Sequence, residues 1–484
     1  MSGENSVKEN RFSWIRWAAW GYIALPFLIF LLGWVKWYIA VPAVLLVAFA
    51  IIWKADKADA RFPILQKEDR KKLLIAAVLI LGWVVLAGIG GLVFQNTDHR
   101  YRNELFRMLV ERSWPIRETV ETDGTTQPVF LSYYIAFWLP SALVGKAFGL
   151  EAGFIFQIFW AALGIFLVSC EMSRMLKRWS VSALVIFILF SGLDVIGCIA
   201  MKHFDYITDW QRHMELWCGF QFSSHTTQLF WVFNQAIYGW LLTLMILNEK
   251  SNRKIILIWS FGLMACTFPF VGMLPFLVYR ILANWKQEAS EGQGSAAEKI
   301  KGLFTVENVL AGGTVGILSF LYLGGNASAN NVEGGQTFFY LGYFLRVFAF
   351  VLLEAGVYHL AVCRYQWKNP LFWITLGTLL ACPFVRIGGG IDFCMRASIP
   401  ALLVLCVLVI DSLQKAREKK CRWNIALICA VLVVGCVTPA HEFIRTIART
   451  NGAEREYIGA ETVLSEPNFA SPADGSLFIK YLAK

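Results

Sequence analysis

The sequence predicts an all-α, polytopic membrane protein, and two observations support this prediction. Of the 484 residues, 57% are hydrophobic and only 16% are charged, whereas soluble domains contain about 45–50% apolar and about 25% charged residues. The apolar residues gather in runs of roughly 18–25, the length that crosses a hydrocarbon core of about 30 Å. Because a backbone in lipid has no water to bond, each run is expected to be a helix. The composition excludes a soluble enzyme.

The apolar runs define about 13 candidate spans. The clearest is Leu73–Phe94, which contains no charged residue. Pro269 and Pro275 interrupt the stretch 255–282, and because proline breaks a helix we interpret this stretch as a short hairpin that crosses twice. The candidate spans are 17–34, 37–53, 73–94, 152–170, 179–199, 228–248, 255–267, 270–282, 306–323, 337–362, 370–384, 397–411 and 423–438.

Lysine and arginine in the short loops predict the direction of each span. Lys54–Lys72 contains seven basic residues and Asp411–Arg422 contains five, and such loops face the cytoplasm. Arg174–Arg178 and Lys250–Lys254 are two further basic loops. This assignment places the N-terminus inside and the C-terminus outside, in a multi-pass protein of the plasma (cell) membrane. It also accounts for the net charge of +10 without a nucleic-acid partner.

One apolar segment, Pro128–Gly149, conflicts with this assignment. If it crossed the membrane, the basic loop Arg174–Arg178 would face outward, against the positive-inside bias. The segment also contains Pro140 and Lys146. We therefore expect an amphipathic or partly embedded helix on the outer face.

The predicted outer loops are longer than most inner loops and carry more residues able to do chemistry. We expect one transmembrane domain over 1–438, which includes a first outer loop with surface helices at 95–149, and a short outer tail at 439–484. The tail is too short for a typical domain. This asymmetry indicates that the protein acts on the extracytoplasmic side. The outer loops are 95–127, 202–227, 324–336, 385–396 and the tail.

The first outer loop contains the strongest catalytic candidate, Asp98. Apolar residues recur at helical spacing from Tyr101 to Val110, which predicts a short helix lying on the membrane or on the spans. Asp98 stands at the start of this helix, where the helix dipole favours an ionised carboxylate, with His99 and Arg102 within one turn. Such a carboxylate can accept a proton from a hydroxyl and act as a general base. The alternative is that Asp98 only caps the helix.

The order of features around Asp98 resembles the front half of the GT-C superfamily of membrane glycosyltransferases. A long apolar span leads to Asp98, an amphipathic helix follows, and the run Gln127–Tyr134 then leads to Lys146–Gly149. Members of that family carry a catalytic Asp in a large first outer loop, followed by a Pro-x-x-x-x-Tyr helix on the outer face that ends in Phe-Gly. The similarity covers roughly residues 73–180 and agrees with placing Pro128–Gly149 outside.

The resemblance implies an inverting transfer of a sugar from a polyprenyl-phosphate donor in the outer leaflet to an extracytoplasmic glycan, lipid or protein acceptor. Asp98 is then the catalytic base that deprotonates the acceptor hydroxyl, and His99 and Arg102 are expected to contact substrate. The chain differs from the family in having two spans before the span that leads to the catalytic loop, whereas the family usually begins with that span. It also has His99 where many relatives have a second acidic residue, so neither a second carboxylate nor a bound metal carries over.

A second loop, Val385–Arg396, offers cations for the leaving phosphate. Arg386 and Arg396 stand on either side of Asp392 and three glycines, and glycine lets a backbone approach a ligand closely. Arginine forms paired hydrogen bonds with phosphate, and fixed cations stabilise the charge that develops on a leaving group. The alternative is a knot of ion pairs among the three charged side chains that braces a tight turn.

The outer loop 202–227 collects histidine and acidic residues. Its composition permits a divalent metal, but no ligand spacing of a known site is present, so we assign no metal ligand and no certain cofactor. His213 and Glu215 are candidates for binding donor phosphate or acceptor, or are part of a solvated loop. His225, a further substrate-binding candidate, begins a span whose polar residues either line a substrate groove or bond neighbouring helices.

Two other functions remain open on the sequence alone. A transporter or flippase would use Glu354, His359 and the broken stretch 255–282 as a site between helices, although the two halves of the chain show no duplicated hydropathy pattern. A ligase or polymerase of lipid-linked glycans also has large outer loops, but it consumes a diphosphate-linked oligosaccharide. No nucleotide-binding motif is present, which agrees with a lipid-linked donor.

Overall fold

The computed structural model describes residues 14–53, 70–122, 125–290, 296–326, 341–385, 387, 391–452 and 454–484. Within these ranges, nine helical segments are long and apolar enough to cross a membrane, which agrees with the predicted all-α polytopic fold. They are α1 (Trp14–Trp34), α6 (Leu150–Met175), α7 and α8 (Val181–Leu189, Asp194–Ala200), α10 (His225–Asn248), α12 and α13 (Thr267–Gly272, Leu274–Ser290), η4 and α15 (Val306–Gly312, Gly313–Leu323), α17, η5 and α18 (Leu341–Val351, Leu352–Gly356, Val357–Gln366), α20 and α21 (Asp392–Ala397, Ile399–Glu418), and α22 and α23 (Arg422–Gly435, Val437–Arg449).

Shorter elements complete the described fold. Apolar ones are α2 (Trp37–Ile52), η2 and α5 (Ile135–Trp138, Leu139–Phe148), α11 (Ile255–Ala265), and α19 with η6 (Pro370–Ala381, Cys382–Phe384). The others are α3 (Arg70–Leu86), α4 (His99–Glu111), α9 (Asp205–Thr208), η3 (Met214–Leu216), α14 (Ala296–Lys301), α24 (Ala460–Ser465), η7 (Phe478–Leu482) and the strands β1 (Arg117–Thr122), β2 (Thr125–Leu131) and β3 (Ala470–Pro472).

Helices α10 and α21 form the centre of the bundle. Every residue of α10 from His225 to Leu247 is buried except Trp231, which is partly buried. A helix that is apolar on all sides is stable only when other elements surround it, and α6, α11 and α21 pack around α10. The Trp83 ring of α3 stacks on Trp240 of α10, with 5.9 Å between centroids. The core of the bundle therefore lies around α10 and α21, the two helices that are buried along most of their length.

The expectation that Leu73–Phe94 is one uninterrupted span is wrong at its C-terminal end. Helix α3 stops at Leu86, and Gly88, Gly90 and Gly91 follow with positive φ, a conformation that glycine adopts without steric cost. Side chains satisfy the carbonyl groups that the helix no longer bonds. Gln95 Nε2 donates to Gly88 O (2.8 Å), and Arg455 Nε donates to Gly90 O (3.2 Å).

The segment Pro128–Gly149, expected to be an amphipathic or partly embedded helix, is helical only from Ile135 onwards. It begins inside β2, which lies between β1 and β3 in an antiparallel sheet, and continues through η2 into α5. Every residue from Val129 to Ala142 is buried, because α1, α4, α6 and α11 cover η2 and α5. Protein therefore shields the first two thirds of the segment, whereas Leu143 and Phe148 near its end are exposed.

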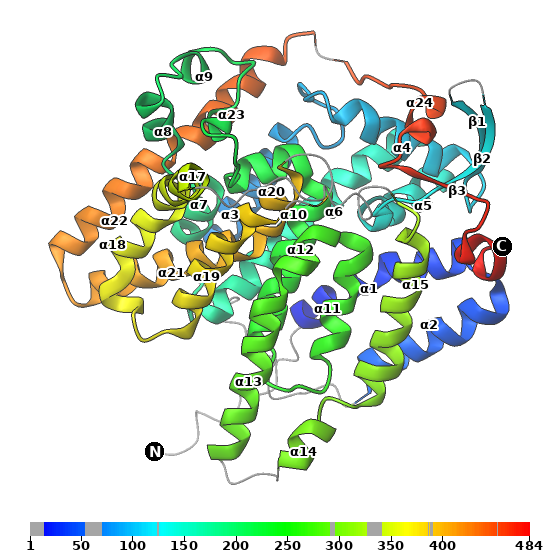
Figure 1. The fold of residues 1–484 in the computed structure, drawn as a ribbon, viewed down its shortest axis with the longest axis horizontal. Coiled ribbons are helices and arrows are strands. Elements are labelled where there is room, and N and C mark those ends of the chain that lie inside the picture. The colour runs from blue at the N-terminus through cyan, green and yellow to red at the C-terminus, as the bar shows by residue number, and fades with distance from the viewer. Residues whose placement is uncertain are drawn as a thin grey trace.

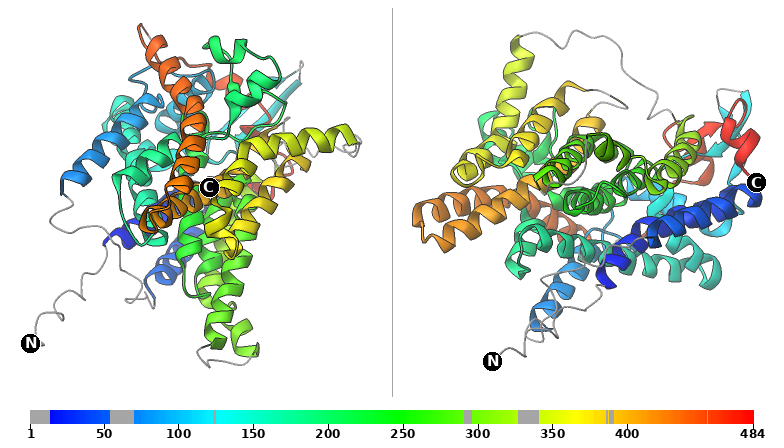
Figure 2. Two further views of the ribbon diagram at one scale, coloured as in Figure 1. Left: turned by 90° about the vertical axis from the view of Figure 1, so that its left-hand side faces the viewer. Right: turned by 90° about the horizontal axis from the view of Figure 1, so that it is seen from below.

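The C-terminal residues after α23 fold back onto the first outer loop. β3 pairs with β2 and adds the third strand of the sheet, and α24 packs against α4. The chain then reaches the turn between α1 and α2, where Lys484 N donates to Trp34 O (2.9 Å). In the right-hand view of Figure 2, this segment lies between the strands and the N-terminal helices.

Contacts between residues distant in sequence define two opposite ends of the bundle. At one end, Lys254 Nζ donates to Ile51 O (2.8 Å), and Asn248 Nδ2 donates to Glu171 O (2.9 Å). We call this the basic end, because the basic turns after α6 and α10 lie there. The sheet, α4, α9, α23 and α24 lie at the opposite end, the top in Figure 1, whereas α13 and α14 reach the bottom. We call the top the sheet end.

The later helices run between the same two ends. At the sheet end, Phe220 packs on Tyr343 at the start of α17 (5.6 Å between centroids), and Tyr343 OH donates to Pro383 O after α19 (2.6 Å). At the other end of α18, Gln366 Nε2 donates to Asp411 Oδ2 of α21 (2.6 Å). Helices α18, α19 and α21 therefore alternate in direction.

The stretch 255–282 turns back on itself, as expected of a hairpin. Helix α11 ends at Ala265, the short α12 forms the bend, and α13 returns. Near the end of α13, Asn284 Nδ2 donates to Asn252 Oδ1 (2.9 Å), and Asn252 Nδ2 donates to Ile281 O (3.2 Å). The start of α11 and the end of α13 are therefore neighbours at the basic end.

The packing of η7 predicts that the C-terminal segment stabilises the whole bundle. Phe478 is fully buried. It stacks on Phe30 of α1 and Phe130 of β2, at 5.9 and 6.3 Å between centroids, and meets Tyr322 of α15 edge to face at 5.3 Å. We expect Phe478→Ala to lower the free energy of unfolding in detergent by about 3–5 kcal/mol, because the cavity cannot collapse fully.

Leu477→Ala is the matched control, since Leu477 is 58% exposed and its truncation should change stability by about 0.5 kcal/mol or less. Equal denaturation midpoints for the two variants would contradict an anchoring role for η7.

Candidate active site

Asp98 lies directly before α4, where the loop after α3 turns into that helix. Its backbone N–H donates to Asn96 Oδ1 (3.2 Å), but its side chain makes no hydrogen bond to the helix N-terminus. The carboxylate is 47% exposed, and its Oδ2 lies 3.2 Å from Arg102 Nη2, one turn further along α4. Capping therefore does not account for this residue, and its carboxylate is open to an incoming group.

Arg102 is buried beneath Asp98. Its guanidinium lies over the ring of Phe233 in α10, 5.3 Å from the ring centroid, which is a favourable position for a cation. Nη2 donates to Asp98, but Nη1 is buried and has no hydrogen-bond partner. Because buried donors in proteins are nearly always paired, this N–H is a candidate donor to a ligand.

Arg396 occupies a similar position on α20. Its Nη1 lies 3.5 Å from Asp392 Oδ2 and donates to Tyr134 OH (3.3 Å). The Arg396 side chain is largely buried, whereas the Asp392 side chain is 37% exposed. Arg396 Nε, like Arg102 Nη1, is buried without a partner.

These groups belong to one cluster although they come from three distant segments. Arg396 interacts electrostatically with Asp98, and Tyr133 interacts with both Arg102 and Arg396. Burial raises the pKa of Tyr133 well above its usual value, so this phenol keeps its proton and can donate a hydrogen bond. We call the cluster the Asp98 site; it consists of Asp98, Arg102, Tyr133, Tyr134, Asp392 and Arg396.

The arrangement of the Asp98 site suits a reaction in which a hydroxyl attacks and an anion leaves. Two half-exposed carboxylates, Asp98 and Asp392, can accept protons from ligands. Beneath them, Arg102 and Arg396 hold positive charge in a low-dielectric setting, where each charge acts more strongly on a developing anion than it does in water.

His99, predicted to contact substrate, points away from the Asp98 carboxylate into the core. Its ring stacks on Phe233 (5.5 Å), its Nε2 lies 3.3 Å from Phe230 O, and Gln95 Nε2 lies 3.2 Å from its Nδ1. Burial, and to a lesser degree the charge of Arg102, lowers the pKa of His99 to about 3. His99 is therefore a neutral side chain that fixes the start of α4 on α10.

The structure sets His225, another predicted ligand, apart from the Asp98 site. His225 lies in the core between Phe187 and Phe190, at 4.5 and 5.4 Å between ring centroids, and its Nδ1 is 2.9 Å from Phe187 O. These contacts brace the break between α7 and α8. Arg386 lies outside the described residues.

Glu215 belongs to a separate group of buried carboxyls at the sheet end. Its Oε1 accepts from Ser224 N (2.9 Å) and its Oε2 from Gln221 Nε2 (2.8 Å). Burial, with a further contribution from Asp194, raises the pKa of Glu215 to about 8. Trp217 Nε1 donates to Glu354 Oε1 (2.7 Å) beside it. This group ties the loop 202–224 to α8 and η5.

His213 belongs to a third group, on α23. Its Nδ1 lies 3.3 Å from Glu442 Oε1, and its Nε2 lies 3.2 Å from Arg445 Nη1. Its ring meets Trp231 of α10 edge to face, at 4.4 Å between centroids. His213, predicted to bind donor phosphate or acceptor, is thus paired with residues of α23, most of which was expected to belong to a short outer tail.

Sequence reasoning missed Tyr133 and Tyr134 as site residues, and it missed Glu442 and Arg445 altogether. The tyrosines stood in the Pro-x-x-x-x-Tyr run, which signalled their position but not their neighbours. On α23, Glu442 and Arg445 are three residues apart on one helical face, which is the spacing of an ion pair. That signal was available, but it is common on helix surfaces.

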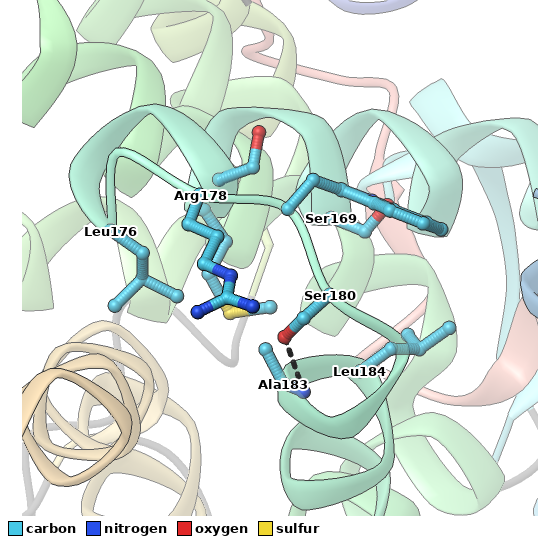
Figure 3. A pocket seen from close by; sticks show the side chains of 9 residues that line it. Ser169, Leu176, Arg178, Ser180, Ala183 and Leu184 are labelled. Carbon is cyan, nitrogen blue, oxygen red and sulfur yellow. Dashed lines mark hydrogen bonds between the residues drawn. The ribbon is translucent and has the colours of Figure 1, made fainter. Parts of the chain in front are cut away.

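A pocket at the basic end is unrelated to the Asp98 site. It has a volume of about 180 Å³ and lies at the turn between α6 and α7, lined by Ser169, Ser173, Arg178 and neighbouring apolar side chains. Figure 3 shows Ser180 capping α7 there, with Ser180 Oγ accepting from Ala183 N (3.2 Å). In the described part of the chain, no group of three or more His, Cys, Asp or Glu residues could hold a metal ion. All eleven cysteines are free.

The chain was compared with families, curated proteins and solved structures. No family model, curated protein or solved structure matches it. A role for the Asp98 site therefore has to be inferred from its own geometry and chemistry.

The burial of His99 predicts a specific acid sensitivity. Below pH 6.5 the unfolded chain takes up a proton on this histidine, whereas the folded chain does so only near pH 3. Stability is thus lost as the pH falls from about 6.5 towards 3. We expect His99→Gln to show a shallower fall of the thermal midpoint than the wild type over this window, measured in detergent. Parallel curves for the two proteins would show that His99 is not held neutral by the fold.

Proposed function

We propose that the protein is an inverting glycosyltransferase that moves a sugar from a polyprenyl-phosphate donor to an extracytoplasmic acceptor. The observation that carries this proposal is the Asp98 site, where a half-exposed carboxylate lies over two buried arginines that each have an unpartnered N–H. The resemblance of residues 73–180 to GT-C enzymes supports the same assignment.

In the proposed reaction, Asp98 accepts the proton of the acceptor hydroxyl. The hydroxyl oxygen forms a bond to the anomeric carbon while the bond from that carbon to the phosphate oxygen breaks on the opposite face, so the configuration inverts. The lipid phosphate leaves with the bonding electrons. Arg102 Nη1 and Arg396 Nε are the donors available to this phosphate, and arginine is well suited to bind it. Tyr134 OH accepts a hydrogen bond from Arg396 Nη1 and so helps to orient that guanidinium group.

The direction of the helices supports thirteen crossings with the sheet end outside. The contacts that join successive helix ends alternate between the basic end and the sheet end. Four crossings beyond the nine long segments are then made by α2, α3, α11 and α19, which are shorter than a usual span. The basic turns after α6 and α10 face the cytoplasm, by the positive-inside bias, in the plasma membrane.

This orientation makes a direct prediction about accessibility. We expect an epitope tag inserted at Gly452, in the exposed turn after α23, to be labelled by antibody in intact cells. A tag inserted between Ser290 and Ala296 should be labelled only after permeabilisation. Labelling in the opposite sense would place the Asp98 site in the cytoplasm and remove the support for an outer-leaflet lipid donor.

A transporter is the second candidate, and one observation favours it. Asp194 and Glu354 are buried carboxyls that share a hydrogen bond, in spans that are interrupted at 190–193 and by the π-helical turn η5. Intramembrane carboxyls of this kind often mark ion pathways. Vesicles containing the purified protein separate the two functions, because transport accumulates an unaltered solute whereas transfer gives a new covalent product.

The decisive experiment replaces the base. We expect Asp98→Asn, reconstituted with polyprenyl-phosphate-linked single sugars and membrane extract as acceptor source, to lose about 10²–10⁴-fold in the rate of polyprenyl phosphate release. The amide keeps the size of the side chain but cannot take the proton.

Glu118→Gln is the matched control. It neutralises a carboxylate of similar exposure in the same outer loop, where Glu118 pairs with Arg112 away from the Asp98 site, and it should retain the wild-type rate. An Asp98→Asn protein that is folded and as active as Glu118→Gln would remove Asp98 as the base.

A further inference from the structure

A second cluster of polar and aromatic side chains lies beside the Asp98 site, on α23 and the loop 202–224. Glu442 is its centre, because it accepts from Trp231 Nε1 (3.2 Å), lies 3.3 Å from His213 Nδ1, and lies 3.6 Å from Arg445 Nη1. Arg445 also lies over the Trp231 ring, 5.0 Å from its centroid. Positive and negative charge are thus paired within the cluster.

The cluster has donors and acceptors that the protein leaves unused. Arg445 Nε is buried and has no hydrogen-bond partner. The same holds for His441 Nε2, one turn earlier on the same face of α23. A small pocket opens against this face, lined by Asn96, Phe94, Phe230, Ala87, Glu442, Arg445 and Thr446. It has room for one small polar group, such as a hydroxyl, and not for a whole sugar ring.

This pocket is connected directly to the catalytic base. Asn96, in its wall, accepts a hydrogen bond from the backbone N–H of Asp98 and donates one from Nδ2 to Phe230 O (2.7 Å). A ligand in the pocket therefore contacts Asn96, which lies two residues before Asp98 in the chain and is hydrogen-bonded to it.

At its other end, the cluster reaches the surface through Trp210. The Trp210 ring packs on His441, with 4.9 Å between centroids and an angle of 31° between planes, and it is 39% exposed. Asp209, Gln211 and Arg212 beside it are exposed. A row of side chains thus runs from Trp210 through His441 and Arg445 to the pocket.

We propose that this row binds a saccharide and that the acceptor of the proposed transfer is a glycan. Trp210 stacks on one sugar ring, His441 and the Arg445–Glu442 pair hydrogen-bond hydroxyl groups, and a single hydroxyl of the terminal ring enters the pocket beside Asn96 and Asp98. The inference rests on the proposed function for the direction of the reaction, but the binding of saccharide is independent of it.

The composition of the row favours a saccharide over the other acceptor classes. A sugar presents adjacent hydroxyls that both donate and accept, which match a guanidinium and a carboxylate side by side, and apolar ring faces that cover indole. A phosphate headgroup would meet the Glu442 carboxylate, whose like charge opposes it. A lipid alcohol would leave most of this row of polar side chains, which extends to the aqueous surface, without hydrogen-bond partners.

The test is direct binding, measured on protein in nanodiscs with an array of mono- to tetrasaccharides that includes neutral, amino and uronic acid sugars. We expect the wild type and Asp98→Asn to bind the same saccharides. Arg445→Gln and Glu442→Gln should each weaken binding by about 10-fold or more, since a hydrogen bond to a charged group contributes about 1.5–3 kcal/mol.

Trp210 provides a second series that leaves the core intact, because the side chain is partly exposed. Trp210→Ala should weaken binding by about 10-fold, whereas Trp210→Phe, which keeps an aromatic face, should retain most of it. Arg112→Gln, at the C-terminal end of α4 where Arg112 pairs with Glu118, is the matched control for loss of an arginine and should bind as the wild type does.

Two results overturn the inference: no saccharide on the array binds to the wild type, or binding survives unchanged in Arg445→Gln and Glu442→Gln. Transfer to a lipid or peptide acceptor without saccharide binding would leave the proposed function standing and remove this one. Saccharide binding without any release of polyprenyl phosphate would support the saccharide site and remove the proposed function.

Discussion

Hydrogen bonding by backbone groups in apolar surroundings is the constraint on which this structure depends. A helix that breaks inside such a bundle frees carbonyl groups that no water can reach, and here side chains from other elements bond them. At the end of α7, His225 N and Nδ1 bond Phe190 O and Phe187 O, and Thr226 Oγ1 donates to Ile188 O (2.7 Å). Polar residues therefore stand at the start of α10 because they bond the free carbonyl groups at the end of α7.

The same constraint shapes the Asp98 site. Helix α3 stops at Leu86, and the glycines after it leave room for Gln95 and Arg455 to bond the loop carbonyls. The chain can then turn into α4, whose first turn packs on Phe233 of α10. This turn brings Asp98 and Arg102 to the same level as α20. Arg102 and Arg396 each pair with an aspartate but keep one buried N–H without a partner. An unpaired buried donor is costly, which is the physical reason for expecting a ligand there.

The sheet end is assembled from segments that have little order of their own. Strand β3 has three residues and pairs with β2 only because the chain returns across the bundle. Phe478 and Lys484 then anchor that return on α1, α15 and the α1–α2 turn. Both clusters proposed to bind substrates lie at this end, so their geometry depends on the C-terminal residues even though Asp98 is far away in sequence.

The sequence by itself determined the fold class and the position of Asp98 at the start of a helix, because apolar run length and helical spacing are local properties. It could not determine where Leu73–Phe94 stops being helical, since that depends on Arg455, more than 350 residues away. Nor could it show that protein covers Val129–Ala142, because the same apolar side chains suit contact with lipid or with other helices. Only the tertiary structure decided that Arg396 and Tyr134 join Asp98 while His99 and His225 turn inward, because ion pairing and burial act between segments that the sequence keeps apart.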